Sequence, residues 1–253
     1  MRAMSATLGR LVNSHGEALD HVWRPAAGDG APVVVIGHGL TSEWDRPWQA
    51  ELAEQLAARG LGSLRFSFSG NGASEGTFLD SCPTKEARDL SAVLDALEAR
   101  GAGPLAYVGH SMGALVGVLT AGRGEERLGA LVSLAGMVHA RAFADVHLAH
   151  LGTGGAIVGK ADKPLGDTLL ADLTSIDTVL PLAPRVAVPW LLVHGDDDEI
   201  VPVQDSVDAA GAAGEGAELV VLEGHDHSFT GGRREVMATL VADWLAARLA
   251  PGR

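Results

Sequence analysis

The sequence has 253 residues, of which 47% are hydrophobic and 20% charged, and its formal net charge at pH 7 is -13. This composition excludes a disordered chain, and the acidic balance argues against nucleic acid as a partner because phosphate binding depends on clustered Lys and Arg. Cys82 is the single cysteine, which excludes an internal disulfide and a cysteine-based zinc site.

Hydrophobic runs in the sequence are too short for a membrane span. No stretch reaches about 18 uninterrupted apolar residues, and the first ten residues, MRAMSATLGR, have no long apolar run behind their arginines. We therefore expect neither a secretory signal nor a membrane anchor. The expected location is the cytoplasm, with no membrane partner.

Strand and helix patterns alternate from the first residues onward. Two alternating segments around Ser14-His15-Gly16 predict a hairpin at a sheet edge, and the β-branched run PVVVIG, residues 32–37, predicts a strand buried on both faces. Helical periodicity over 84–100 begins beside Thr84, which we expect to cap that helix. The predicted elements of this half are strands over 6–12, 17–24, 32–37, 61–68 and 104–109, and helices over 46–59 and 84–100.

The same alternation continues in the second half, with one interruption. The predicted elements are helices over 113–121, 203–213 and 232–249, and strands over 129–135, 190–193 and 218–222. Such alternation predicts an α/β fold with a mostly parallel sheet of about eight strands and helices on both faces. Residues 136–185 contain no clear strand, so we expect a single domain over 1–253 with an inserted lid at about 136–185.

The residues that follow the predicted strands carry the chemistry. Ligands of an open parallel sheet bind beyond the carboxyl ends of its strands, where this chain has HGL, GHSMG, HGDDDEIVP and GHDHSF. Together these stretches contain Ser, Asp and His in that order. A serine hydroxyl becomes a nucleophile when an imidazole takes its proton, and a carboxylate must orient that imidazole. The GxSxG stretch around Ser111 alone is a weak signal, but the combination is specific.

These four motifs resemble the α/β-hydrolase fold superfamily over nearly the whole chain. In that family the acid commonly stands before a Val-Pro as Asp198 does, and the histidine follows a glycine by three as His227 does, which leaves His225 the weaker candidate. The resemblance implies a catalytic Ser111, Asp198 and His227. It also implies an oxyanion hole formed by the backbone N–H groups of Leu40 and Met112.

The glycine-rich stretch RFSFSGNGASEG, residues 65–76, indicates the subfamily. It is similar to the corresponding loop of small feruloyl or cinnamoyl esterases and of serine-aminopeptidase-like hydrolases. Ser67 stands where those proteins often have Asp, and Asn71 where they often have His, so the resemblance says little about contacts made by this loop. A phosphate cradle is disfavoured because no Lys-Ser or Lys-Thr follows the glycines.

The resulting expectation is a hydrolase of short to medium acyl or aryl esters that needs no cofactor and no metal and works through an acyl-enzyme. We expect substrate contacts from His38, Gly39, His110 and Phe143, the last being the one aromatic residue of the lid. Four further polar residues of the lid are expected on a solvated face, although they could meet an anionic substrate; they are His139, Arg141, His147 and His150.

Other uses of the same residues remain open. Amide, peptide or thioester hydrolysis would use the same three residues, and a non-catalytic binding module could keep the cavity without the chemistry. A divalent metal could bind His225 and His227 together with the aspartates at 196–198, but that would leave Ser111 unexplained. The sequence leaves a homodimer open.

Overall fold

The computed structural model describes residues 8–26, 28 and 30–249. Within them the main sheet has seven strands in the order β3-β5-β4-β6-β7-β8-β9. β3 runs antiparallel to β5 and every other neighbouring pair is parallel. The strands are β3 (His21–Arg24), β4 (Val33–Gly37), β5 (Gly62–Phe66), β6 (Leu105–His110), β7 (Leu128–Leu134), β8 (Trp190–Gly195) and β9 (Ala217–Leu222). The predicted α/β fold class is confirmed.

The predicted edge hairpin differs in detail. β1 (Leu11–Val12) pairs with β2 (Ala18–Leu19) in a separate two-stranded sheet, and β3 alone joins the edge of the main sheet. The sequence-based count of about eight strands had assigned 6–12 to the main sheet; residues 6 and 7 lie outside the described residues. The short hairpin strands lack the continuous apolar run that buries a central strand.

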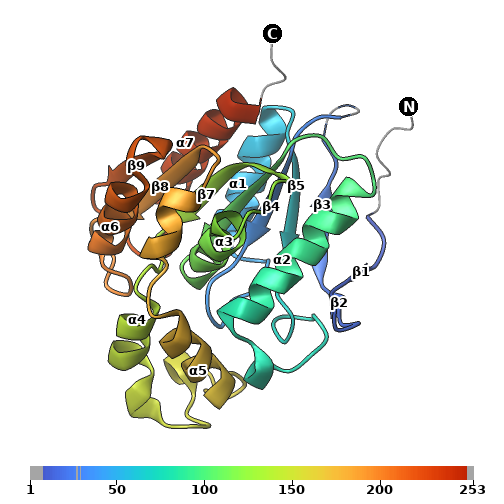
Figure 1. Cartoon of the computed structure of the whole chain (residues 1–253). Coiled ribbons are helices and arrows are strands. Elements are labelled where there is room, and N and C mark those ends of the chain that lie inside the picture. The colour runs from blue at the N-terminus through green and yellow to red at the C-terminus, as the bar shows by residue number, and fades with distance from the viewer. Residues whose placement is uncertain (1–7, 27, 29, 250–253) are drawn as a thin grey trace.

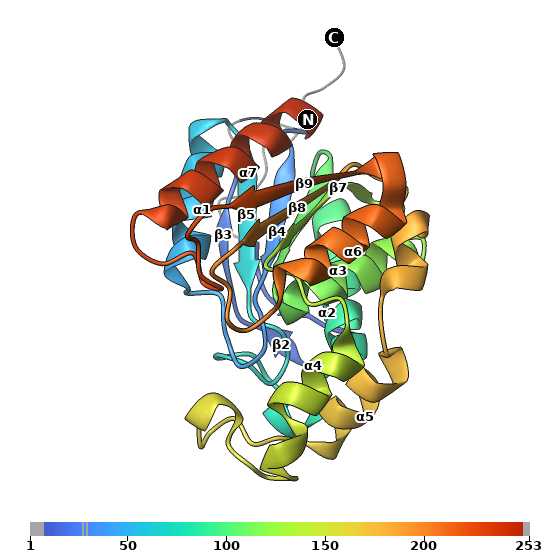
Figure 2. The ribbon, with the colours of Figure 1, turned by 90° about the vertical axis from the view of Figure 1, so that its left-hand side faces the viewer.

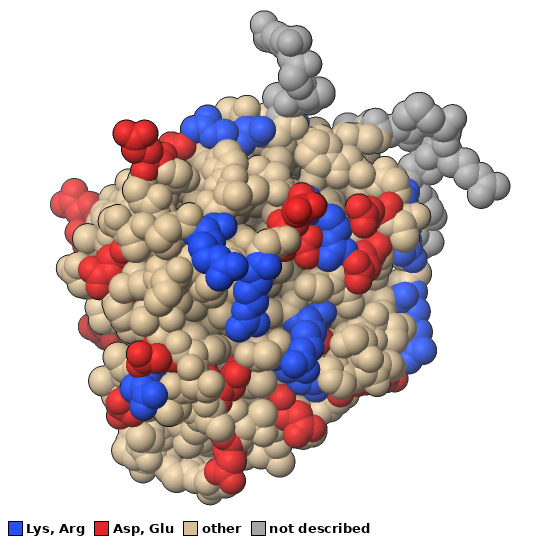
Figure 3. Space-filling model, viewed as in Figure 1, with Lys and Arg blue, Asp and Glu red and all other residues tan. Residues whose placement is uncertain are grey.

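Helices cover both faces of the main sheet, as Figures 1 and 2 show from two directions. One face is covered by α1 (Pro47–Ala58) and α7 (Arg233–Leu249), and the other by α2 (Pro83–Glu98), α3 (Met112–Gly122) and α6 (Val203–Ala213). On the outer surface of the α2 and α3 side, acidic and basic side chains are mixed (Figure 3). None of the described helices is long and apolar enough to cross a membrane.

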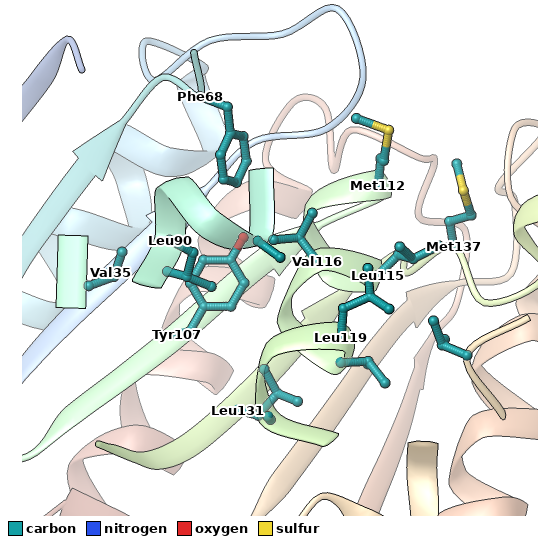
Figure 4. Close-up of a cluster of buried hydrophobic side chains, with 14 of the residues drawn as sticks. Val35, Phe68, Leu90, Tyr107, Met112, Leu115, Val116, Leu119, Leu131 and Met137 are labelled. Atoms are coloured by element: carbon teal, nitrogen blue, oxygen red, sulfur yellow. The ribbon is translucent and has the colours of Figure 1, made fainter. Parts of the chain in front are cut away.

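The strand side chains alternate between two cores. Val33 and Val35 of β4 pack on the side of α2 and α3, whereas Val34 and Ile36 pack on the side of α1 and α7. This period of two explains why the run is apolar throughout, since both faces of the strand are buried. Figure 4 shows the first core, in which Tyr107 of β6 lies among side chains of α3.

The start of α2 departs from the sequence prediction. The helix begins at Pro83 with Cys82 at the capping position, because proline is well suited to the first helical turn. Thr84 does not cap the helix. Its N–H and its hydroxyl donate hydrogen bonds of 2.8 Å each to the two carboxylate oxygens of Asp172.

The segment between β7 and β8 is largely helical. Its α-helices are α4 (Ala140–His147) and α5 (Asp167–Ile176). The short 3₁₀ turns η2 (Ala149–Leu151) and η3 (Ile157–Gly159) lie between them, and η4 (Leu180–Arg185) follows α5. Two further 3₁₀ turns lie elsewhere, η1 (Phe78–Asp80) and η5 (Gly214–Gly216). In Figure 2, α4 and α5 lie beyond the carboxyl ends of the parallel strands.

Candidate active site

Ser111 occupies a sharp turn between β6 and α3. Its backbone has φ 56° and ψ -120°, a left-handed conformation that costs a residue other than glycine about 1–3 kcal/mol. The turn needs glycine on both sides: a Cβ atom at Gly109 would lie 2.3 Å from the Gly113 carbonyl oxygen, and one at Gly113 would lie 2.4 Å from the His38 carbonyl oxygen. The spacing of the GHSMG motif is therefore a steric requirement of the turn.

Asp198 and His227 form a hydrogen-bonded pair on the loops after β8 and β9. His227 Nδ1 lies 2.7 Å from Asp198 Oδ2, and the Asp198 side chain is fully buried. Asp198 Oδ1 accepts hydrogen bonds from the backbone N–H groups of Ile200 and Val201, at 2.8 and 2.9 Å. The carboxylate is thus held in one orientation toward the imidazole.

A second histidine, His194 of β8, also contacts Asp198. His194 Nε2 lies 3.2 Å from Asp198 Oδ2 and 3.0 Å from the Val201 carbonyl oxygen, and Nδ1 lies 2.7 Å from Ser206 Oγ. Since both neighbours of Nε2 are acceptors, Nε2 carries the proton and Nδ1 accepts from the serine hydroxyl. His194 therefore supplies Asp198 with a further donor.

These contacts determine the charge of Asp198. Burial by itself would raise the pKa of its carboxyl group, but hydrogen bonds from His194, His227 and the Val201 N–H, together with the charge of His227, hold that pKa well below its usual range. Asp198 is thus ionised at neutral pH. An ionised acid beside Nδ1 fixes the His227 tautomer whose Nε2 is free to accept a proton.

Two other buried histidines hold the loops of the site while remaining neutral. Burial lowers the pKa of His110 to about 3, and its Nε2 lies 2.7 Å from the backbone carbonyl oxygen of His227. Burial likewise lowers the pKa of His38 to about 4; its Nδ1 bonds to the Gly39 carbonyl oxygen and its Nε2 accepts from the Phe68 N–H. His110 therefore links the serine turn to the His227 loop.

The backbone N–H groups of Leu40 and Met112 can donate hydrogen bonds to a ligand. Neither donates any of the backbone hydrogen bonds that join turns and loops in the described part of the chain, and Met112 is the first residue of α3. The first N–H groups of a helix have no partner within it. Gly39 keeps the two turns close together, since a Cβ atom there would lie 2.9 Å from Ser111 Cβ. Both groups are available to a ligand oxygen.

Ser111 and His227 line one cavity of about 480 Å³. The Ser111 hydroxyl makes no hydrogen bond to His227 within the described residues, whereas the His227–Asp198 hydrogen bond is formed. Apolar side chains form much of the wall, namely Leu40, Trp48, Phe143, Val158 and Ile200. A side-chain set for proton transfer therefore meets an apolar cavity of small-molecule size.

Comparison with known proteins agrees with this geometry. Residues 33–240 match the sequence model of the alpha/beta hydrolase family. This chain belongs to the alpha/beta hydrolase family. The superfamily that the four motifs resembled is thereby confirmed, and the matched residues include Ser111, Asp198 and His227.

Relatives of this hydrolase family member are distant. Two uncharacterized proteins of Mycobacterium tuberculosis are each 29% identical to it over 205 residues, which cover 80% of this chain and 65% of theirs. The chain thus spans about two thirds of the length of these curated relatives.

Solved structures share its fold over nearly the whole chain. Est1E from Butyrivibrio proteoclasticus with bound ferulic acid superimposes with a TM-score of 0.83 at 23% identity, covering 96% of this chain and 99% of Est1E. Mouse alpha/beta hydrolase domain-containing protein 10 gives 0.77 at 20% identity, covering 97% and 100%. The esterase domain of a Rhodothermus marinus protein gives 0.71 at 19% identity, covering 95% and 98%.

Three of the four residues expected to contact substrate line the cavity. Gly39, His110 and Phe143 line the cavity, whereas His38 is 1% exposed, uses both ring nitrogens on the backbone and does not line it. Of the polar residues of the helical segment, Arg141 bonds to Asp177 and His139 to Asp208, and none of the four considered lines the cavity.

The metal alternative finds no supporting geometry in the described residues. Within them no group of three or more His, Cys, Asp or Glu side chains is arranged to hold a metal ion. His225 Nδ1 bonds to the Glu223 carbonyl oxygen, and the Asp198 carboxylate is hydrogen-bonded to His227 and His194.

Several cavity residues had no signal in the sequence. Arg46, Lys160 and Arg234 line it from three separate parts of the chain, and Trp48 lies beneath His110 with ring centroids 5.3 Å apart. Their convergence depends on how loops distant in sequence meet. His194 could have been suspected, because it precedes the glycine and aspartates at the end of β8.

Proposed function

We propose that this chain is a serine hydrolase that cleaves carboxylic esters with short to medium acyl or aryl groups. One observation carries the proposal: Ser111, held in a strained turn, lines the same cavity as His227, whose Nδ1 is bonded to the buried Asp198. A hydroxyl, an imidazole and an ionised carboxylate in that relation are what nucleophilic acyl transfer requires.

The first half-reaction forms an acyl-enzyme. His227 Nε2 takes the proton of Ser111 as Oγ attacks the ester carbonyl carbon, and Asp198 stabilises the resulting imidazolium. The imidazolium then protonates the leaving alcohol as the ester C–O bond breaks. The Ser111–His227 hydrogen bond forms when substrate binds, as catalytic hydrogen bonds often tighten only in the enzyme–substrate complex.

The second half-reaction returns the enzyme to its initial state. His227 removes a proton from water, the hydroxide attacks the acyl carbon, and Ser111 leaves with the proton held by His227. In both halves the tetrahedral oxyanion is stabilised by the N–H groups of Leu40 and Met112, which donate none of the loop and turn hydrogen bonds in the described residues. No step requires a cofactor.

The cavity supports substrates of modest size. Its volume of about 480 Å³ and its aromatic residues Trp48 and Phe143 suit a short acyl chain or an aromatic acid. We treat 1–253 as one domain in which residues 136–185 act as a lid, because Phe143, Val158 and Lys160 of this segment form part of the wall. The names of the solved esterases with this fold favour an ester over an amide or a thioester.

The test is a series of p-nitrophenyl esters, from acetate to longer acyl chains, together with a feruloyl ester. Wild type should show an optimum at short or medium chain length. Ser111→Ala should reduce kcat by roughly 10⁴-fold or more, because the nucleophile is lost while the fold stays intact. Ser91→Ala, on the outer helix α2, is the matched control and should retain wild-type turnover.

The outcomes separate the alternatives. Ester turnover that survives in Ser111→Ala would contradict the proposed nucleophile. Labelling of Ser111 by a fluorophosphonate without turnover of any ester would point to amide or thioester substrates. Absence of both labelling and turnover would leave a non-catalytic binding module.

A further inference from the structure

The charged side chains of the cavity are all of one sign, apart from its histidines. The whole chain is acidic, with 32 Asp and Glu against 19 Lys and Arg. Among the described residues that line the cavity, however, Arg46, Lys160 and Arg234 are present and no Asp or Glu is. Random placement of charges in so acidic a chain would favour carboxylates. The charged side chains of the cavity are therefore opposite in sign to the net charge of the molecule.

The three cations reach the cavity from three parts of the chain. Arg46 precedes α1 on the loop after β4, Lys160 follows η3 in the lid segment, and Arg234 lies in the first turn of α7. Each side chain is partly buried rather than extended into solvent. Three separate parts of the chain thus bring like charges to one cavity, which is unfavourable unless an anion joins them.

Lys160 and Arg234 have no carboxylate partner within the described residues. Lys160 Nζ donates to the Thr41 carbonyl oxygen at 2.9 Å, and Arg234 Nε donates to the Gly231 carbonyl oxygen at 3.2 Å. These bonds orient the two cations without neutralising them. The remaining donors of both groups stay available, and a guanidinium can present two of them to one carboxylate.

Arg46 is only weakly neutralised. Its guanidinium lies 3.5 Å from Glu43 and 3.8 Å from Asp45, and its Nε is buried with no hydrogen-bond partner among the described residues. Because Nε is shielded from solvent, the Nη groups are the donors of Arg46 that can reach a ligand in the cavity.

We propose that the substrate of this cavity is an ester that carries a carboxylate away from the scissile bond, recognised by Arg46, Lys160 and Arg234. This inference rests on the proposed ester hydrolysis and specifies the substrate class of the same site. The carboxylate supplies the missing counter-charge. A neutral ester of equal size leaves the three cations as they are and gains nothing from them.

The acidity of the molecule works against this selectivity, so the preference for an anion has to come from the cavity itself. The net charge of -13 repels an anion at long range, whereas the three cations attract it at contact. Contacts between partly exposed charges are screened by salt, with a Debye length of about 10 Å at 0.1 M. Preference for the anionic ester should therefore fall as ionic strength rises.

The experiment compares matched pairs of esters. Mono-p-nitrophenyl adipate against p-nitrophenyl heptanoate places the carboxylate on the acyl side, with a chain too long for rapid anhydride formation. 4-Acetoxybenzoate against 4-acetoxyacetophenone places it on the leaving group. Each kcat/KM is divided by the rate of hydroxide-catalysed hydrolysis of the same ester, and the anionic-to-neutral ratio is taken for wild type, Arg46→Gln, Lys160→Gln and Arg234→Gln.

Arg233→Gln is the control. Arg233 is the exposed neighbour of Arg234, carries the same charge at the same helix end and does not line the cavity. We expect the wild-type ratio to exceed one in one of the two pairs and to fall about tenfold in each cavity variant, as for loss of a hydrogen bond to a charged group. It should not change in Arg233→Gln, and it should decrease for wild type between 20 mM and 500 mM NaCl.

A wild-type ratio at or below one in both pairs would overturn the inference, and so would an equal fall in Arg233→Gln and Arg234→Gln. The salt series needs no variant, so a variant that fails to fold does not remove the test. Turnover of neutral esters with no anionic preference sinks the inference and leaves the esterase standing. Absence of all turnover and of fluorophosphonate labelling sinks both.

Discussion

Two buried carboxyl groups of this protein differ in charge although water reaches neither. Asp198 has a fully buried side chain and a pKa held well below its usual range, and Glu86 of α2 is 1% exposed with a pKa well above its usual range. Asp198 accepts hydrogen bonds from two histidines and two backbone N–H groups. Glu86 accepts one, from Ser81 Oγ at 2.9 Å, and its Oε2 has no partner among the described residues.

The difference shows that burial alone does not set ionisation. Removal from water disfavours the charged form of both groups, and for Glu86 the one hydrogen bond is too little to offset it, with Asp89 adding repulsion. For Asp198 the donors outweigh burial. A buried acid is therefore kept charged where its surroundings supply enough donors, as they do for Asp198 beside His227.

The largest effect is expected from Asp198→Asn. An amide in this place presents donors to His227 and His194, disturbs the His227 tautomer and cannot stabilise the imidazolium. We expect kcat on a p-nitrophenyl ester to fall roughly 10³- to 10⁴-fold. Asp197→Asn, one residue away on the exposed part of the loop, should stay close to wild type. Turnover of Asp198→Asn within tenfold of wild type would remove Asp198 from the mechanism.

A smaller effect is expected from His194, which acts through Asp198. His194→Phe keeps a buried ring but removes the donor at 3.2 Å from the carboxylate. We expect kcat to fall about tenfold with little change in KM, the amount that one hydrogen bond to a charged group contributes. His194→Gln restores a donor and should recover part of the loss. An effect on KM alone, or no recovery with Gln, would make His194 a packing residue only.

The smallest effect, on stability alone, is expected from Glu86→Gln. Because the folded-state pKa of Glu86 is raised, its stabilisation of the fold is complete below the unfolded pKa of about 4.3 and is lost as pH rises toward the folded pKa. Glutamine has no proton to lose. The free energy of unfolding of Glu86→Gln should exceed that of wild type by about 1 kcal/mol or more at pH 8 and by less at pH 5.

Urea unfolding at the two pH values measures this difference, and Glu98→Gln, an exposed glutamate of the same helix, should show none. A wild-type protein that gains stability from pH 5 to pH 8 relative to Glu86→Gln would mean that Glu86 is ionised in the fold.

The parts of the molecule that the sequence predicted are those set by local pattern. The run around Val33–Gly37 is apolar at every position because both faces are covered, and that pattern is visible without a structure. The requirement for Gly109 is likewise local, since a Cβ atom there would meet the Gly113 carbonyl oxygen, whereas the requirement for Gly113 comes from the distant His38 carbonyl.

What could not be predicted depends on distant contacts. The ring of His38 faces inward to bond Phe68, 30 residues away, and nothing in HGL indicates that direction. Arg141 of the inserted segment is exposed and pairs with Asp177, as a solvated face implies, whereas Lys160, which no sequence pattern indicated, lines the cavity. Side-chain partners that lie far apart in sequence decide such placements, and periodicity carries no information about them.

The inserted segment is attached more firmly at α5 than near η3. Asp172 ties α5 to α2 through both carboxylate oxygens, whereas near η3 the single bond from Lys160 to the Thr41 carbonyl oxygen reaches the turn beside Leu40. We expect the inserted segment to pivot at α5 and the hydrogen bond from Lys160 to Thr41 to break when the segment moves. Each admission of substrate would then open and re-form the contact beside the turn that presents the Leu40 amide. The Ser42 N–H donates to the Gly39 carbonyl oxygen across that turn, so hydrogen exchange at the Ser42 amide should accelerate in Lys160→Gln and stay constant if Lys160 does not hold the turn.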